Sequence, residues 1–292
     1  MTTPAFRPDP RLFPFESRWF DGPGGRVHYL DEGEGAPILL LHGNPTWSFV
    51  YRGVIIRLRK QYRCIAPDYP GFGLSEHPPD YRYTPAEHAE VIRALVQELG
   101  LEDLTVVGHD WGGPIGMRLA LDEVDRLRAL VMGNTWYWPL EAVHLRAFGW
   151  LMSTGYVQSL IHKRNLFVEK IIPVGVKHTL ADEVMEHYRM PFPTMDSRAG
   201  VAELARQLTR SANWLDEIDY ALPDTLGNVP LLLTWGMEDL AFTPAFMDRF
   251  RSDFARSRAV RLEAKHFIQE DAPAEMSGAI REFLEEDRSA SQ

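Results

Sequence analysis

Apolar residues gather along the chain in short continuous runs, and longer stretches of helical periodicity separate these runs. The runs at residues 38–41 and 231–233 contain no polar position. Runs of this kind are typical of strands covered on both faces, as in a mainly parallel sheet flanked by helices. The pattern predicts strands at residues 27–30, 37–41, 63–67, 104–107, 129–132, 229–235 and 259–262.

The stretches between these strands carry the signals of amphipathic helices. Thr84, Pro85 and Glu87 combine a capping box with a proline at the first helical position, and Gly100 supplies a stop. The apolar stripe between them consists of Val91, Ile92, Leu95, Val96 and Leu99. Further helices are predicted at residues 115–121 and 275–285. The alternation indicates a doubly wound α/β sheet, whose ligand sites lie beyond the carboxyl ends of its strands.

One long segment, residues 136–226, interrupts the alternation because it contains no convincing strand. Its helical stretches are rich in large apolar side chains, among them Trp138, Trp150 and Phe167. Both ends of the segment return directly to predicted strands. We therefore expect a helical cap (lid) of residues 136–226, inserted into an α/β core domain of residues 1–135 and 227–292. An independent helical domain is the alternative.

Composition narrows the classes of function. Of the 292 residues, 45% are hydrophobic, and the formal net charge is -10 with no long run of Lys or Arg, so we expect no nucleic-acid binding. There is no signal-peptide pattern and no apolar window of the roughly 18–20 residues that a membrane span needs. We therefore expect a cytoplasmic protein without membrane contact. The single cysteine, Cys64, excludes an internal disulfide and is expected in the core.

The strongest chemical signal is the turn Gly108-His109-Asp110-Trp111-Gly112, which lies between an apolar strand and a helical run. This is the context of a nucleophile elbow, in which a sharp turn exposes the central side chain at the carboxyl edge of the sheet. The central residue is Asp110, where esterases have serine. A carboxylate is ionised at neutral pH without a base. It can therefore displace a leaving group from an sp³ carbon and form an alkyl ester.

Hydrolysis of such an ester needs a base that activates water and an acid that orients the base. The expected chain order is nucleophile, acid, histidine. Asp239 follows the sixth predicted strand, and His266 lies just beyond the seventh. We therefore assign Asp110 as nucleophile, His266 as base and Asp239 as the acid that holds the imidazole in the water-activating tautomer. Glu238 is the competing acid.

A second glycine turn, His42-Gly43-Asn44, follows the second predicted strand. The backbone N–H groups of Asn44 and Trp111 are expected to form an oxyanion hole, in which loss of one donor typically reduces the rate by about 100- to 1000-fold. The Asn44 amide and the Trp111 indole offer further N–H donors that could hold an anion departing opposite Asp110. His42 is expected to satisfy the turn backbone rather than to take part in catalysis.

Three motifs give the sequence a specific resemblance to a known family. They are His42-Gly43-Asn44-Pro45-Thr46-Trp47-Ser48, Gly108-His109-Asp110-Trp111-Gly112-Gly113 and His266-Phe267-Ile268-Gln269-Glu270-Asp271. They resemble the motifs of haloalkane dehalogenases of the α/β-hydrolase fold, and the likeness spans nearly the whole chain. The resemblance implies a hydrolase without cofactor or metal, which converts a small hydrophobic haloalkane and water to a primary alcohol and halide through an ester on Asp110. It also implies His266 as base, Asp239 as acid, and Asn44 with Trp111 as the halide-binding pair.

Members of this family place the acid either after the strand that precedes the cap or after the strand that follows it. The first of these loops contains Asn134, which cannot accept a full charge, so Asp239 in the second loop is favoured. Members also differ in the second halide donor, which is either an asparagine of the glycine turn or a cap tryptophan. Asn44 favours the first arrangement, while Trp136 and Trp138 leave the second open.

Other functions are not excluded by these residues. Epoxide hydrolases share the fold, the aspartate and the histidine, but the alkoxide of an opened epoxide needs a proton donor, usually a cap tyrosine. The cap tyrosines considered are Tyr137, Tyr156, Tyr188 and Tyr220. Asn44 beside an indole suits a halide, which needs no proton, and so favours dehalogenation. The residues are also compatible with a cofactor-independent oxygenase or luciferase, and with a protein that only binds a hydrophobic ligand. The sequence predicts no oligomeric state.

Overall fold

The protein was analysed as a computed structural model, which describes residues 6–140 and 143–290. The described strands form one eight-stranded sheet in the order β1-β2-β4-β3-β5-β6-β7-β8. Strands β3 to β8 run parallel to one another, whereas β2 pairs antiparallel with β4 and β1 pairs antiparallel with β2. The strands are β1 (Arg18–Gly22), β2 (Gly25–Glu32), β3 (Pro37–Leu41), β4 (Arg63–Pro67), β5 (Leu104–Asp110), β6 (Leu127–Thr135), β7 (Leu231–Gly236) and β8 (Ser257–Leu262).

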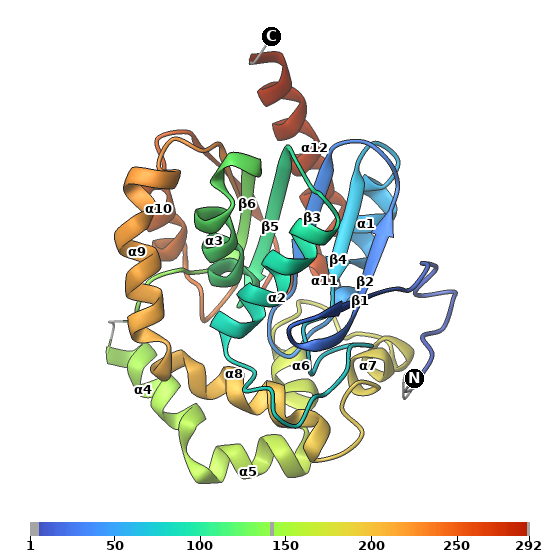
Figure 1. Ribbon diagram of the computed structural model, residues 1–292. Coiled ribbons are helices and arrows are strands. Elements are labelled where there is room, and N and C mark those ends of the chain that lie inside the picture. The colour runs from blue at the N-terminus through green and yellow to red at the C-terminus, as the bar shows by residue number, and fades with distance from the viewer. Residues whose placement is uncertain (1–5, 141–142, 291–292) are drawn as a thin grey trace.

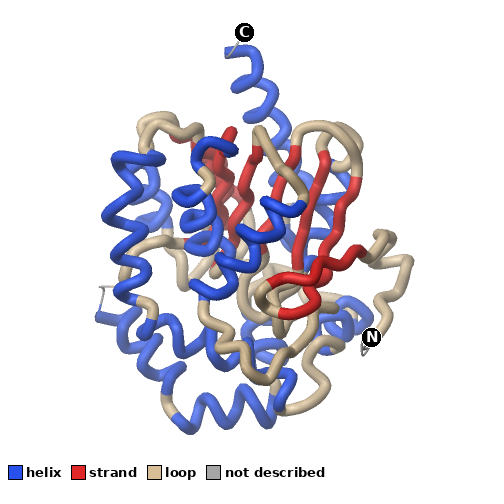
Figure 2. Tube along the Cα trace, viewed as in Figure 1, coloured by secondary structure: helices blue, strands red, loops and turns tan. Residues whose placement is uncertain are grey.

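Helices cover both faces of this sheet, with α2 and α3 on one face and α1 and α12 on the other (Figures 1 and 2). The core helices are α1 (Arg52–Leu58), α2 (Pro85–Glu98), α3 (Gly112–Asp122), α10 (Pro244–Asp253), α11 (Ile268–Asp271) and α12 (Pro273–Ala290). The observed architecture confirms the predicted α/β-hydrolase fold. It also explains the uninterrupted apolar runs, because the side chains of Ile38 and Leu39, which point to opposite faces, are both fully buried.

The predicted helical cap is confirmed as an insertion between β6 and β7. Its helices are α4 (Val143–Ser153), α5 (Gly155–Arg164), α6 (Ile172–Val174), α7 (Asp182–Arg189), α8 (Ala199–Arg210) and α9 (Ala212–Leu226). Figure 1 shows α4 to α8 grouped beyond one end of the sheet, while α9 runs back toward the core and packs against α3. The limits of the cap, residues 136–226, stay a prediction.

One strand was not expected, and the bounds of several others differ from the prediction. The strands expected at residues 27–30, 129–132, 229–235 and 259–262 are observed as β2, β6, β7 and β8 with the bounds given above. The sequence pattern did not predict β1, whose side chains are exposed or half-buried and therefore lack a clear apolar periodicity. The strand expected to end at residue 107 continues as β5 to Asp110, because the parallel pairing with β6 extends as far as that residue. The nucleophile candidate is thus the last residue of a strand.

The structure confirms the predicted capping box and the predicted burial of the single cysteine. Thr84 accepts a hydrogen bond from the Glu87 backbone N–H at 3.2 Å, and the Glu87 carboxylate accepts from the Thr84 N–H at 3.3 Å, which is the predicted capping box. Cys64 is fully buried in the core. None of the helices that the structure describes combines the length and the apolar character that crossing a lipid bilayer requires.

Candidate active site

The turn between β5 and α3 has the geometry of a nucleophile elbow. Asp110 has a left-handed backbone with φ of 51°, a conformation that costs a non-glycine residue about 1–3 kcal/mol and persists where the surroundings enforce it. The neighbouring glycines are required, since a Cβ on Gly108 would lie 2.6 Å from the Gly112 carbonyl oxygen. A Cβ on Gly112 would lie 2.1 Å from the carbonyl oxygen of Leu41. The elbow therefore holds the aspartate at the carboxyl end of a central strand.

The Asp110 carboxylate is held by backbone donors. The N–H of Asn44 donates to Oδ1 at 2.8 Å, and the N–H of Trp111 forms a second hydrogen bond to the carboxylate. Burial raises the pKa of Asp110, although His266 and these two N–H groups act in the opposite direction. The two donors expected to form an oxyanion hole thus bind the aspartate itself.

His266, in the loop between β8 and α11, lies beside this carboxylate. Its Nε2 is 3.8 Å from Asp110 Oδ2, and its Nδ1 is hydrogen-bonded to Asp239 Oδ2 at 2.9 Å. Burial alone would lower the pKa of His266, but the charge and hydrogen bond of Asp239 raise it above the ordinary value. The same interaction lowers the pKa of Asp239 to about 2, against the effect of burial. The three residues therefore form one contiguous Asp–His–Asp arrangement.

Asn134, which the sequence excluded as the acid, supports Asp239 instead. Its Nδ2 donates to Asp239 Oδ2 at 2.9 Å, and its Oδ1 accepts from the Gly236 N–H at 2.7 Å. The Ala241 N–H donates to the other Asp239 oxygen at 2.7 Å. Asp239 consequently has a donor on each oxygen in addition to His266. Only the position of Asn134 at the end of a strand could have suggested this role.

Glu238, the competing acid, points away from the histidine. Its carboxylate accepts a hydrogen bond from Lys177 Nζ at 2.6 Å, and its side chain is 46% exposed. Its neighbour Asp239 is only 2% exposed. Burial and hydrogen bonding thus separate the two adjacent carboxylates, and only Asp239 contacts His266.

The Asn44 side chain connects the site to the cap. Its Nδ2 donates to the carbonyl oxygen of Val201 in α8 at 3.1 Å, while its Oδ1 is buried without a hydrogen-bond partner among the described residues. An amide nitrogen carries two hydrogens, so one N–H is left for a ligand. The Trp111 ring is 2% exposed, and no acceptor among the described residues is hydrogen-bonded to its indole N–H.

The two cap tryptophans occupy different surroundings. Trp136 is fully buried, with its ring 4.7 Å from that of Trp111 and stacked on Phe242 at 5.1 Å. Phe242 in turn stacks on the His266 ring at 5.5 Å, so Trp136 lies in the layer of rings around the site. Trp138 instead packs against side chains of α10, including Arg249, whose guanidinium carbon is 4.2 Å from its ring centre.

The cap tyrosines do not offer a free proton donor near Asp110. Tyr188 and Tyr137 are buried, and their hydroxyls donate to the carboxylates of Glu270 and Asp253 respectively. Burial and these nearby carboxylates raise the pKa of both tyrosines. Tyr156 is 75% exposed and Tyr220 is 89% exposed.

Two further histidines complete the surroundings. His42 Nδ1 donates to the Gly43 carbonyl at 3.0 Å, and its Nε2 accepts from the Tyr69 N–H at 3.2 Å, which confirms the expected structural role. His109 was not predicted to contribute. It is fully buried, its Nε2 donates to the His266 carbonyl at 2.8 Å, and its ring lies 4.7 Å from the His266 ring. Burial, with the nearby His266, lowers the pKa of His109 to about 3, so it is a neutral donor.

Comparison with known proteins agrees with this geometry. A family model described as alpha/beta hydrolase fold matches residues 36–273. The chain is 50% identical over 279 residues to haloalkane dehalogenase 2 of Mycobacterium tuberculosis, covering 95% of this chain and 98% of that protein. It is 31% identical over 287 residues to a cis-3-alkyl-4-alkyloxetan-2-one decarboxylase of Shewanella oneidensis, covering 94% and 90% of the two chains. The crystal structure of haloalkane dehalogenase DbeA from Bradyrhizobium elkani is similar with a TM-score of 0.86 at 27% identity, covering 94% of this chain and 99% of that one.

Proposed function

The chain belongs to the α/β-hydrolase fold family and, within it, to the haloalkane dehalogenases, and from this membership we propose that Asp110, His266 and Asp239 are its catalytic residues. As a haloalkane dehalogenase, the protein converts a haloalkane and water to an alcohol and a halide. The observation that carries the assignment is the contact series from Asp110 Oδ2 to His266 Nε2 at 3.8 Å and from His266 Nδ1 to Asp239 at 2.9 Å.

In the first step, Asp110 displaces the halide. Oδ1 is engaged by the Asn44 N–H, so the attacking atom is Oδ2. The new bond joins Oδ2 to the substrate carbon as the carbon–halogen bond breaks, and the halide leaves with the electron pair. The remaining Asn44 amide N–H and the Trp111 indole N–H stabilise the departing anion.

In the second step, water hydrolyses the alkyl ester. His266 Nε2 removes a proton from water, and the resulting hydroxide attacks the Asp110 carboxyl carbon. Negative charge develops on Oδ1, which already accepts the Asn44 N–H, so the donors are in place before the reaction. The bond from the carboxyl carbon to Oδ2 then breaks. The alcohol leaves with Oδ2 and takes a proton from the imidazolium, while Asp239 stabilises the charged imidazole.

Halide release from short primary bromoalkanes tests the activity, and trapping of the ester tests the residues. Purified protein is expected to release bromide, Asp110→Asn to release none, and His266→Phe to release about one equivalent and retain the alkyl group. Mass spectrometry of a His266→Phe digest should locate that group on Asp110. Absence of bromide release from all bromoalkanes would exclude dehalogenation, whereas bromide release without an Asp110 adduct would exclude the covalent step.

Two other reactions compete with dehalogenation as the function of this site. Epoxide opening is disfavoured because the hydroxyls of Tyr137 and Tyr188 are engaged by carboxylates. Decarboxylation of a cis-dialkyl oxetan-2-one is the stronger competitor, since a relative of 31% identity bears that name. Release of carbon dioxide from such a lactone with a larger kcat/KM than bromide release would overturn the proposed substrate class.

A further inference from the structure

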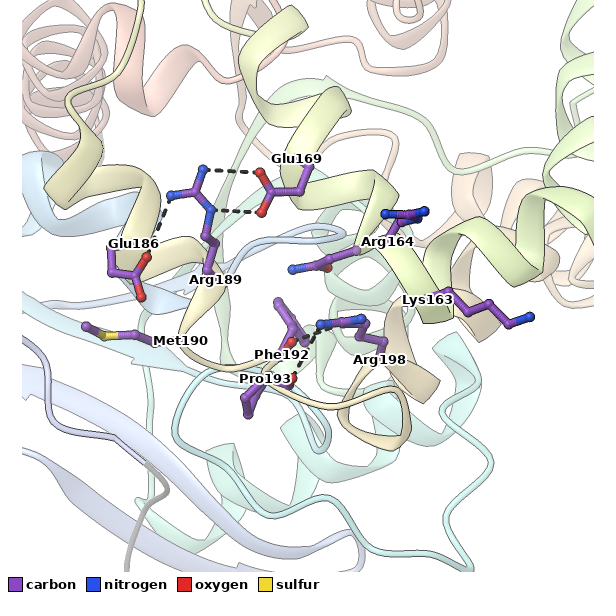
Figure 3. A pocket seen from close by; sticks show the side chains of 10 residues that line it. Lys163, Arg164, Glu169, Glu186, Arg189, Met190, Phe192, Pro193 and Arg198 are labelled. Carbon is purple, nitrogen blue, oxygen red and sulfur yellow. Dashed lines mark hydrogen bonds and ion pairs between the residues drawn. The ribbon is translucent and has the colours of Figure 1, made fainter.

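The cap carries an open pocket of about 490 Å³ whose lining residues include none of the proposed catalytic groups. We call it the cap pocket. It lies between the end of α5, the π-helical turn η3 (Phe167–Ile171), α7 and the segment 192–198, as Figure 3 shows. The charged residues that line it are Lys163, Arg164, Arg189, Arg198, Glu169 and Glu186. The cap pocket therefore has two more positive than negative side chains, in a protein whose net charge is -10.

Both carboxylates of the cap pocket lie beside one arginine, whose single charge offsets one of the two. Arg189 donates to the two oxygens of Glu169 at 2.8 and 3.1 Å, and its Nη1 lies 3.6 Å from Glu186 (Figure 3). Lys163 and Arg164 are exposed at the end of α5 and form no ion pair with any residue that the structure describes. The pocket therefore keeps a net positive charge, carried in part by exposed cations that have no ion-pair partner among the described residues.

Arg198 differs from the other cations of the pocket because it is partly buried and bonded to backbone carbonyls. Its guanidinium donates to the carbonyl oxygens of His162, Phe192 and Pro193 at 2.6, 3.0 and 3.5 Å. It forms no ion pair with a carboxylate of the described chain. Burial lowers its pKa, although the charge of Glu169 acts in the opposite direction. Three of its five N–H groups are used, so two stay available for a ligand. A partly buried guanidinium bonded only to carbonyls is a favourable place for an anion.

Asn165 also lines the pocket, but its side-chain oxygen is an acceptor and therefore does not bind an anion. It ends α5 in a left-handed backbone with φ of 49° and is only 5% exposed. Its side-chain oxygen has no hydrogen-bond partner among the described residues, although buried amides are normally satisfied. Basic residues at the end of a helix also offset its dipole. That role accounts for Lys163 and Arg164, so the case for an anion rests on Arg198 and on the net charge of the pocket.

We propose that the cap pocket binds a small organic carboxylate with a short alkyl chain. A planar carboxylate matches the two free N–H groups of Arg198, and Lys163 and Arg164 supply long-range attraction. The alkyl chain packs against Met190 and Pro193, which also line the pocket. Inorganic phosphate lacks this apolar part. The volume lies within the range of about 300–1,000 Å³ that is typical of small-molecule sites. This site is independent of the proposed dehalogenation.

Calorimetric titration with hexanoate at constant ionic strength tests the proposal. The wild-type protein is expected to bind hexanoate with a Kd of about 1 mM. The double variant Lys163→Gln/Arg164→Gln should weaken binding by about tenfold, since both residues are exposed and the fold does not depend on them. Arg146→Gln/Lys170→Gln is the matched control, because it removes the same charge from exposed cap positions outside the pocket. It should change the Kd by less than about twofold.

Three results would overturn the proposal. The first is no saturable hexanoate binding up to about 20 mM. The second is equal weakening by the pocket variant and the control variant, which would indicate a general charge effect. The third is binding of inorganic phosphate as tight as that of hexanoate, which would remove the alkyl chain from the recognition. Bromide release by the pocket variant should match the wild type, so the test does not depend on the proposed catalytic function.

Discussion

The protonation of His266 is set by one buried neighbour. Asp239 accepts its Nδ1–H, and Asn134 and Ala241 keep Asp239 ionised by donating to its two oxygens. The negative charge raises the pKa of the histidine despite its burial. In the alkyl-enzyme, Asp110 is an uncharged ester, so Asp239 is the carboxylate that continues to raise this pKa.

This arrangement predicts the acid limb of ester hydrolysis. The base must be neutral, so hydrolysis slows as the pH falls through the raised pKa of His266. We expect the wild-type limb to lie above the ordinary histidine value of 6.5. Asp239→Asn should slow hydrolysis and move the limb to lower pH, because the charge that raises the pKa is lost. Single-turnover hydrolysis of the ester, measured from about pH 5 to about pH 9, tests this. A limb that does not move in Asp239→Asn would contradict the pairing.

His109 provides a second prediction at the residue scale. Its N–H holds the carbonyl of His266 at 2.8 Å, so its loss should displace the base. His109→Leu is expected to slow ester hydrolysis by about tenfold, which corresponds to roughly 1.4 kcal/mol for one hydrogen bond. His109→Gln, which retains an N–H donor, should recover part of that rate. Rapid-quench kinetics should show unchanged alkylation in both variants, since the first step does not use His266. Equal losses in both steps would indicate a structural effect only.

At the scale of elements, α7 is joined to the core by buried hydrogen bonds. Tyr188 in α7 donates to Glu270 in α11, and Glu270 also pairs with Arg52 at the start of α1. The Trp47 indole donates to the His187 carbonyl at 3.0 Å. Because these groups are buried, breaking one of the hydrogen bonds would leave a polar group without a partner and without access to water. Such a loss lowers the free energy of unfolding.

The contact of Tyr188 predicts a measurable loss of stability. Tyr188→Phe leaves a buried carboxylate with one donor fewer, which should lower the free energy of unfolding by about 1–3 kcal/mol in urea denaturation. Tyr156→Phe is the matched control, because Tyr156 is 75% exposed; it should change stability by less than about 0.5 kcal/mol. Bromide release by folded Tyr188→Phe should persist. A large loss of turnover without a loss of stability would instead assign Tyr188 a role as proton donor.

At the scale of the whole molecule, strand order assembles the site. Strands β3, β5, β6, β7 and β8 are consecutive neighbours and run parallel. Their carboxyl ends therefore lie along one edge, which brings together the segments that carry Asn44, Asp110, Asn134, Asp239 and His266. The cap closes over the same edge, since α8 contacts Asn44 through the Val201 carbonyl.

The sequence by itself determined the parts that local rules govern. The apolar runs predicted the central strands, and a strand–glycine–helix pattern located Asp110, because the turn needs only residues that are adjacent in the chain. The chain order of nucleophile, acid and histidine selected Asp239 and His266. The edge strand β1 was missed because its half-exposed side chains have no strong periodicity.

Only the tertiary structure decided how distant residues support the site. Asn134 and Asp239 are separated by 105 positions, and Tyr188 and Glu270 by 82. One sequence contains no local signal for such hydrogen bonds, because they depend on which strands become neighbours and on how the cap packs. For the same reason, the sequence did not predict the contact of His109 with the base or the net positive charge of the cap pocket. Local chemistry located the reacting groups, and packing between distant segments set their protonation, orientation and surroundings.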